Sequence, residues 1–282
     1  MTDRLRDPFQ ALRWLIEAGA DEAMLEEPVN RFAARPATPI RPAPSPAGER
    51  APIVAKVPPR PAPNTKSAEA VSLGTAPGAA RALAASCTTL AELKTAVSNF
   101  DGCELKRYAT NTVFADGNPL GRIMLIGEAP GRDEDAQGLP FVGRAGKLLD
   151  LMLASIGLDR TKVYITNVLN WRPPQNREPS PEEAAACLPF LHRHIELADP
   201  QILILLGAVS VRHLLGLHDG ITRLRGKWLV YQNPSAGRAI PVMPTLHPAY
   251  LLRQPAAKRL AWRDLLAVSE KLSELGLASS VG

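Results

Sequence analysis

The chain has 282 residues, 45% of them hydrophobic, with a formal net charge of +5. This length suits one α/β domain with additional segments, and the modest basic excess fits a polyanionic partner without specifying one. Only three cysteines occur (Cys87, Cys103 and Cys187), which is no disulfide framework and favours a reducing, cytoplasmic compartment. No run of about 18 apolar residues occurs, so no membrane-spanning helix is expected.

Residues 7–27 predict a short amphipathic helix, because Phe9, Leu12, Leu15 and Ile16 recur at helical spacing. Two interpretations stay open. The helix could dock on the chain's own domain, or it could bind a partner protein.

Residues 28–85 are predicted to form a disordered linker. Between Pro28 and Pro63, 11 of 36 residues are proline, mixed with alanine and arginine. Such a segment buries too little apolar surface to offset the loss of chain entropy on folding.

Residues 86–282 alternate short apolar strands with helices. Strands are expected near 123–126, 163–169, 201–208, 227–232 and 240–248, and helices near 89–100, 145–158, 180–197, 209–217 and 257–275. Ser180 and Glu183 form a capping box at the start of one helix. The alternation predicts an α/β three-layer sandwich with a central, mostly parallel sheet.

Three polar residues lie where predicted strands end: Glu128, Asn167 and His247. Open α/β sheets bind ligands at the carboxyl ends of their strands. These residues are therefore the first candidates for a binding site.

The segment 127–144 joins a strand to a helix through a glycine-rich turn, which is typical of phosphate sites. It matches neither common phosphate-binding motif, and its acidic run, Asp133-Glu134-Asp135, would repel phosphate. A neutral ligand that needs close backbone approach and an aromatic face fits better. A nucleobase stacked on Phe141 meets that description.

Three segments carry a family resemblance: "GEAPGRDEDAQGLPFVGRAGKLL", "YITNVLNWRPPQNREP" and "LHPAYLLR". They resemble the signature segments of uracil-DNA glycosylases, specifically the family 4 branch. The similarity extends over roughly residues 98–270. It implies a DNA repair enzyme that flips uracil out of DNA and hydrolyses its N-glycosidic bond.

The resemblance implies a uracil pocket formed by Gly127, Glu128, Phe141, Asn167 and His247. Phe141 would stack on the base, Asn167 would pair with uracil O4 and N3–H, and His247 would donate to O2 as negative charge develops there.

A carboxylate is also expected near the cationic sugar. In the best-known branch of the superfamily, an Asp two residues after the first glycine positions the attacking water, and Ala129 stands there in this chain. The role passes to Glu128, with Glu134 and Asp135 as further catalytic candidates. Some of this acidic run could instead cap the following helix.

Basic side chains near the ends of the motifs are candidate contacts to DNA phosphates. Any single one could equally be a solvated surface charge. Tyr250 or Leu251 could fill the gap left by the flipped base, or could begin a buried helix. The basic candidates are Arg172, Arg177, Arg223, Arg225, Lys227, Arg253, Lys258 and Arg259.

Family 4 enzymes carry an iron–sulfur cluster on four cysteines. The corresponding places in this chain are Phe100, Cys103, Trp171 and Cys187, so two ligands are replaced by large aromatic residues. We therefore expect no cofactor.

The sequence predicts a monofunctional uracil-DNA glycosylase. Its expected substrate is single- or double-stranded DNA containing uracil, and we expect a monomer that does not associate with membranes. The alternative is a catalytically weak protein that binds uracil-containing or damaged DNA.

Overall fold

A computed structural model of the chain describes residues 76–233 and 239–277. The helix predicted over 7–27 and most of the predicted linker lie outside these residues. Within the described ranges, no helix is long and apolar enough to cross a membrane.

A six-stranded sheet forms the centre of the described domain, in the order β1-β3-β2-β4-β6-β5. Its four inner strands are parallel, as the sequence predicts, and each edge strand pairs antiparallel with its neighbour. The strands are β1 (Asp116–Gly117), β2 (Ile123–Gly127), β3 (Tyr164–Asn167), β4 (Ile202–Leu206), β5 (Leu229–Gln232) and β6 (Ala239–Thr245).

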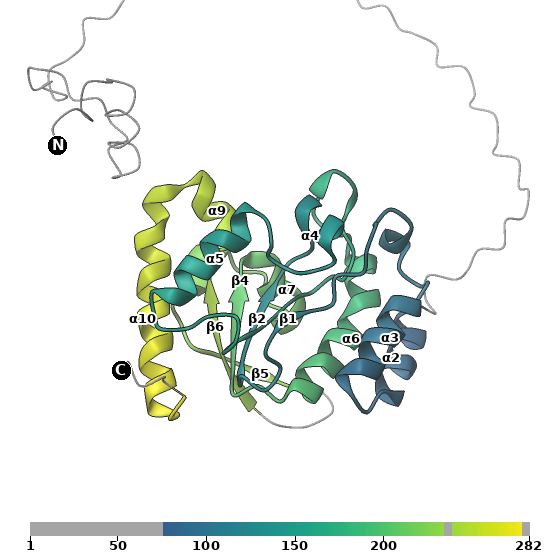
Figure 1. Ribbon diagram of the computed structural model, residues 1–282, viewed down its shortest axis with the longest axis horizontal. Helices are drawn as coiled ribbons and strands as arrows, with labels where there is room; N and C mark the ends of the chain where they lie inside the picture. Colours follow the sequence, from purple (N-terminus) through teal and green to yellow (C-terminus); the bar gives the residue numbers. More distant parts are fainter. Residues whose placement is uncertain (1–75, 234–238, 278–282) are drawn as a thin grey trace, which may run out of the picture. The chain divides into compact units, whose positions relative to one another are not determined.

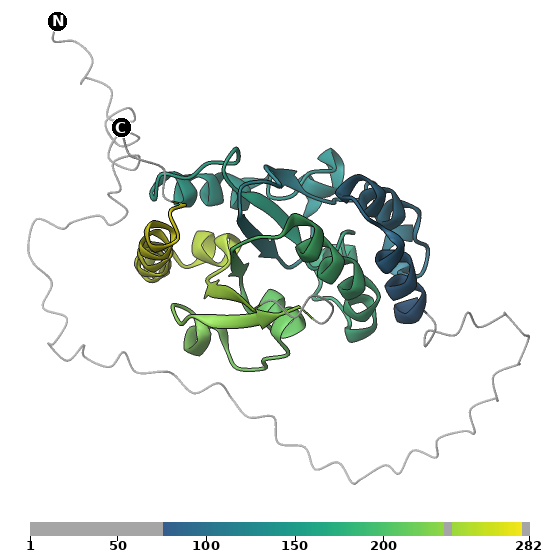
Figure 2. The same cartoon turned by 90° about the horizontal axis from the view of Figure 1, so that it is seen from below.

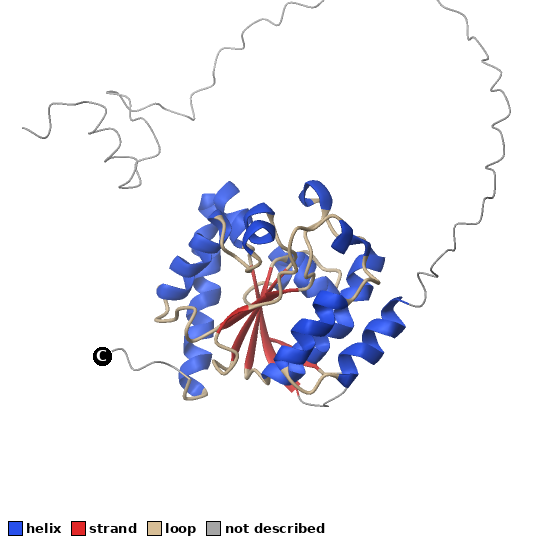
Figure 3. Cartoon of the chain, turned by 45° about the vertical axis from the view of Figure 1, so that its right-hand side comes forward, coloured by secondary structure: helices blue, strands red, loops and turns tan. Residues whose placement is uncertain are grey.

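Helices cover both faces of the sheet (Figure 1). Alternate residues of a strand face the two helical layers. Ile123 and Leu125 of β2 pack toward α5 and α10, whereas Met124 and Ile126 pack toward α6 and α7. This double burial explains why the inner strands read as continuous apolar runs. Figure 3 shows the strands between the two helical layers. The helices are α5 (Arg144–Ala154), α6 (Pro181–Ala198), α7 (Ala208–Leu215) and α10 (Lys258–Glu274).

Two further helices, α2 (Ala76–Ser86) and α3 (Leu90–Asn99), precede the sheet. Figure 2 shows them lying together beside α6, on the other side of the domain from α10. The prediction that the linker continues to residue 85 is wrong, because Ala80 and Ala84 are fully buried in the core. The alanine-rich sequence is a good helix former whose small side chains allow close packing on α6.

Short elements occupy the loops after the parallel strands. The acidic run lies in a helix, α4 (Arg132–Gln137), where the sequence predicts only a turn. The predicted capping box of α6 is confirmed, because the Ser180 side chain accepts from the Glu183 N–H. The remaining elements are η1 (Glu104–Arg107), η2 (Pro174–Asn176), α8 (Ile221–Leu224), α9 (Pro248–Arg253) and η3 (Pro255–Ala257).

Candidate active site

The loops that follow β2, β3 and β6 enclose a cavity of about 280 Å³. All three residues expected at strand ends line it, namely Glu128, Asn167 and His247, together with Phe141. The volume is at the low end of the range for ligand pockets, so it suits one flat ring better than a nucleotide cofactor.

The Asn167 amide is the most informative polar group in the cavity. Asn167 ends β3 directly beside Gly127 of β2, and it is only 3% exposed. Its Oδ1 atom is buried without a hydrogen-bond partner among the described residues. Because such a group costs free energy unless a ligand or water satisfies it, the amide is suited to binding a polar ligand.

Gly127 allows the amide and the aromatic ring to meet. A Cβ atom added at Gly127 would lie 2.4 Å from Asn167 Oδ1 and 2.5 Å from the Phe141 ring. The Phe141 and His247 ring centroids are 5.6 Å apart. The absence of a side chain at position 127 therefore lets one ring face and one amide line the same small space.

His247 has a defined tautomer. It forms the N-cap of α9, and its Nδ1 atom accepts a hydrogen bond from the Ala249 N–H at 3.1 Å. With Nδ1 acting as an acceptor, the ring proton lies on Nε2. Burial, helped by the charge of Arg253, lowers the pKa of His247 to about 4. The side chain is thus a neutral hydrogen-bond donor near neutral pH.

Glu128 also lines the cavity, directly after β2. Burial raises the pKa of its carboxyl above the usual range, and the charge of Glu178 raises it further. Arg212, which forms an ion pair with Glu178, opposes this shift. A carboxylate with a raised pKa can accept a proton from water near neutral pH more readily than an ordinary one.

The two other catalytic candidates bind the backbone instead. Glu134 borders the cavity, but its oxygens accept from the N–H groups of Gly131, Val142 and Gly143. Asp135 is buried and accepts from the N–H groups of Thr110 and Asn111. These contacts support the alternative reading, in which acidic residues cap α4 and hold the turn, and leave Glu128 as the better candidate for a catalytic carboxylate.

Several of the predicted DNA contacts lie around the cavity. Arg177 and Arg253 line it, although the Arg177 guanidinium is paired with both Glu183 oxygens. Arg172 lies in an adjoining hollow, where its Nε bonds Asn176 Oδ1 at 2.8 Å. The remaining candidates with exposed side chains are Arg223, Lys227, Tyr250, Lys258 and Arg259.

Two predicted DNA residues are used within the fold. The Arg225 guanidinium forms an ion pair with Asp264 of α10, which is 1% exposed. Leu251 is also 1% exposed and packs in the core beside α10. A DNA role for either side chain is therefore not supported by its position, whereas Tyr250 remains accessible.

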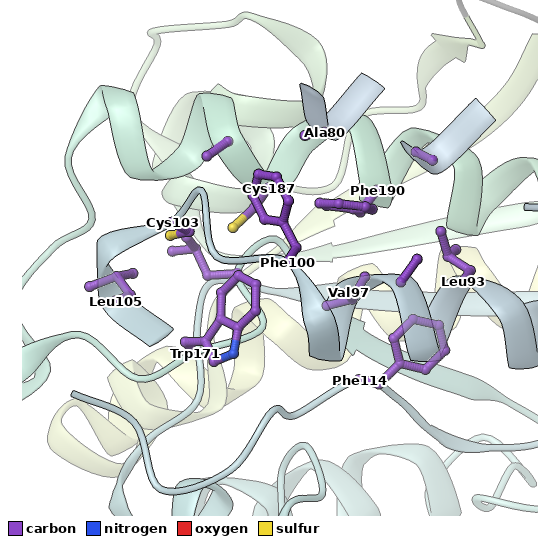
Figure 4. Packing of buried hydrophobic residues seen from close by; sticks show 14 of the residues in the cluster. Ala80, Leu93, Val97, Phe100, Cys103, Leu105, Phe114, Trp171, Cys187 and Phe190 are labelled. Carbon is purple, nitrogen blue, oxygen red and sulfur yellow. The ribbon is translucent and has the colours of Figure 1, made fainter. Parts of the chain in front are cut away.

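The four positions that correspond to cluster ligands meet in one apolar core (Figure 4). Trp171 is 1% exposed and its Nε1–H bonds Thr112 Oγ1 at 3.0 Å. Phe100 packs edge-on against Phe190 with a centroid separation of 5.0 Å. Neither aromatic ring offers a ligand atom. Of the four residues only Cys103 and Cys187 carry thiols, and Cys87 of the same core raises the number to three, so these residues do not fit a cluster held by four protein ligands.

Sequence reasoning missed residues that support the site from outside the three motifs. Gly207, the N-cap of α7, has φ +96° and lies directly under His247, since an added Cβ would be 3.2 Å from the His247 Cβ. Arg160 bonds the carbonyl of Phe141. The sequence does contain a signal for Gly207, because it is a glycine directly after an apolar strand. The contacts of Arg160 join residues far apart in the sequence, so no local pattern indicates them.

Comparisons with known proteins converge on the region that carries the cavity. A family model described as the uracil DNA glycosylase superfamily matches residues 114–266. The type-4 uracil-DNA glycosylase of Archaeoglobus fulgidus is 44% identical over 60% of this chain and 85% of its own length. That of Sulfurisphaera tokodaii is 40% identical over 64% and 84%, and that of Thermotoga maritima is 44% identical over 60% and 87%.

Proposed function

Because this chain belongs to the uracil DNA glycosylase superfamily, we propose that it hydrolyses the bond between uracil and deoxyribose in DNA and leaves an abasic site. The target nucleotide must leave the base stack, since its glycosidic bond cannot be reached inside a duplex. The observation that carries the proposal is the buried Asn167 amide, with its unsatisfied oxygen in a cavity of single-ring size.

Recognition follows from the donor and acceptor pattern of the base. Uracil offers N3–H and O4, which match the C=O and NH2 groups of the Asn167 amide. Cytosine presents the opposite pattern at these positions, so one amide discriminates between the two bases. The Phe141 ring supplies the stacking face.

His247 and Glu128, which also line the cavity, carry out the chemical step. As the C1′–N1 bond breaks, its electron pair moves onto uracil, and His247 Nε2–H donates to O2, where negative charge grows. A donor fixed in advance in this way typically lowers a barrier by about 3–4 kcal/mol. The Glu128 carboxylate faces the cationic sugar and takes a proton from the water whose oxygen bonds to C1′.

Residues at the rim of the cavity would bind the DNA backbone. Arg253 and Arg172 lie beside the opening and would contact phosphates near the flipped nucleotide. Tyr250 is 38% exposed in the first turn of α9, where it could enter the gap left in the duplex.

Excision from a uracil-containing oligonucleotide, followed by alkaline cleavage, tests this function. We expect single-turnover excision by the unaltered chain and a much slower rate for Asn167→Asp, because an ionised carboxylate cannot donate to O4. The matched control is Asn99→Asp, the same chemical change at an exposed position of α3. Binding of uracil-containing DNA without abasic sites would instead favour the catalytically weak binding protein.

We also propose that the protein works without an iron–sulfur cluster. Phe100 and Trp171 fill the core at two ligand positions, and burying each ring stabilises the fold by about 2 kcal/mol or more. We expect a colourless protein that remains active after treatment with a chelator. Anaerobic purification with measurement of iron and the visible spectrum provides the check, and stoichiometric iron with a broad brown absorbance would contradict the proposal.

A further inference from the structure

Phe141 has a backbone conformation that is costly for a residue with a side chain. Its φ is +55°, in the left-handed region that favours glycine. Bulky residues persist there only when the surrounding structure holds them. Contacts from other residues must therefore hold the Phe141 backbone, and with it the ring that lines the cavity.

Charged side chains hold both ends of the peptide group that follows Phe141. Its carbonyl oxygen accepts from Arg160 Nη2, and its N–H, which belongs to Val142, donates to Glu134 Oε1 at 3.0 Å. Gly146 lets this carbonyl approach the start of α5, because an added Cβ would lie 1.6 Å from the oxygen. Rotation of this peptide group would break both hydrogen bonds at once.

Arg160 is itself anchored at three further points. Its Nε donates to Asp150 Oδ1 at 2.8 Å, and its Nη1 donates to Asp116 Oδ2 at 2.5 Å and to the Pro140 carbonyl at 3.2 Å. A planar guanidinium with five donors can bridge these acceptors in one fixed geometry, which a lysine cannot do. The side chain thus connects the loop before β3 to α5, to β1 and to the turn that carries the aromatic ring.

We propose that Arg160 is a positioning residue for the uracil site: by fixing the peptide group after Phe141, it holds the phenyl ring where a flipped uracil stacks. The inference rests on the proposed function. Arg160 does not touch the base. It acts through Phe141, whose ring lies 5.6 Å from that of His247 across the cavity.

The test compares Arg160→Met with Phe141→Leu and with the double variant. For each protein we would measure single-turnover excision, inhibition by free uracil and affinity for DNA with an abasic site. We expect Arg160→Met to raise the uracil inhibition constant on the order of tenfold, the scale of one base–aromatic stack, while affinity for abasic DNA is unchanged. The double variant should bind uracil no more weakly than Phe141→Leu alone, because both changes remove the same interaction.

Arg122→Met is the matched control. Arg122 also pairs with an aspartate, Asp199, and with the carbonyl of the same residue, but it lies before β2, at the opposite end of that strand from the cavity. It should leave uracil inhibition unchanged. If Arg160→Met fails to fold, Asp150→Asn loosens the same guanidinium and should weaken uracil binding in the same direction.

Additive effects of Arg160→Met and Phe141→Leu on uracil inhibition would overturn the proposal. A loss of thermal stability with normal uracil inhibition in Arg160→Met would also overturn it. If Arg160→Met does not fold, the same result in Asp150→Asn would do so. Failure of the proposed function has a different signature. In that case the unaltered chain would not excise uracil at all, and the role of Arg160 would fall with it.

Discussion

At the scale of single residues, three carboxylates that lie close together in the sequence differ in the groups that they contact. Glu134 and Asp135 accept backbone N–H groups, whereas Glu128 lines the cavity with a raised pKa. The motif predicts that a carboxylate acts here. It cannot predict which one, because the hydrogen bonds that occupy the other two come from residues up to 25 positions away.

The first prediction concerns the pH dependence of excision. The base must be ionised, so the rate should fall as pH decreases through the raised pKa of Glu128. Arg212→Met removes a positive charge that lowers this pKa and should move the acid limb to higher pH. Glu178→Gln removes a negative charge that raises it and should move the limb to lower pH.

Because the Arg212 and Glu178 side chains are 40% and 57% exposed, we expect both shifts of the acid limb to be small and to shrink with added salt. Single-turnover rates from pH 4.5 to 8 at low ionic strength measure them. Shifts of the same sign in both variants would show that Glu128 is not the titrating group.

At the scale of elements, the end of β6 is tied to two helices. Thr245 Oγ1 donates to Asp264 Oδ2 of α10 at 2.7 Å, and the Thr245 carbonyl accepts from Gly207 N at 2.9 Å, at the start of α7. Arg225 also bonds Asp264, at 3.0 Å from Nε. His247 follows two residues later, so these contacts set where the loop that carries His247 leaves the sheet.

The second prediction compares Thr245→Val with Thr245→Ser. Valine has the same shape but loses the hydrogen bond to buried Asp264, which should lower the free energy of unfolding by about 1–2 kcal/mol and slow the chemical step. Serine keeps the hydroxyl and should preserve the rate. Urea denaturation and single-turnover excision are the two measurements, and an unchanged rate in the valine variant would mean that this contact supports the fold alone.

The inner strands could be predicted because helices bury both faces of the sheet, so β4 reads as an uninterrupted apolar run. Helix α2 could not, since its buried residues are alanines whose pattern does not stand out from the preceding alanine- and proline-rich sequence. The ion pair of Arg225 could not be predicted from the sequence either. A buried guanidinium and an exposed one have the same sequence signature until the partner, here Asp264 on the last helix, is known.

At the scale of the whole molecule, the domain begins earlier than its composition indicates. Arg193 of α6 donates to the Cys87 carbonyl at 2.9 Å from Nε, and α2 packs against α6 just before this point. The helix therefore belongs to the folded domain rather than to the segment that precedes it.

The third prediction follows from this boundary. A chain shortened to residues 76–282 keeps α2 and its contacts with α6. A chain shortened to 87–282 should lose roughly 2 kcal/mol or more, because it exposes the surface that Ala80 and Ala84 cover. Equal stability of 76–282 and 87–282 in urea denaturation would restore the boundary predicted from the sequence.

The aromatic core around Phe100 and Trp171 has a consequence for how the protein is produced in a cell. A core filled by aromatic side chains can fold as soon as the chain leaves the ribosome, without delivery of a prosthetic group by assembly proteins. Under the proposal made above, iron starvation or oxidative damage to metal clusters would leave its repair capacity intact. Cells depleted of cluster-assembly machinery should then yield the enzyme with full specific activity.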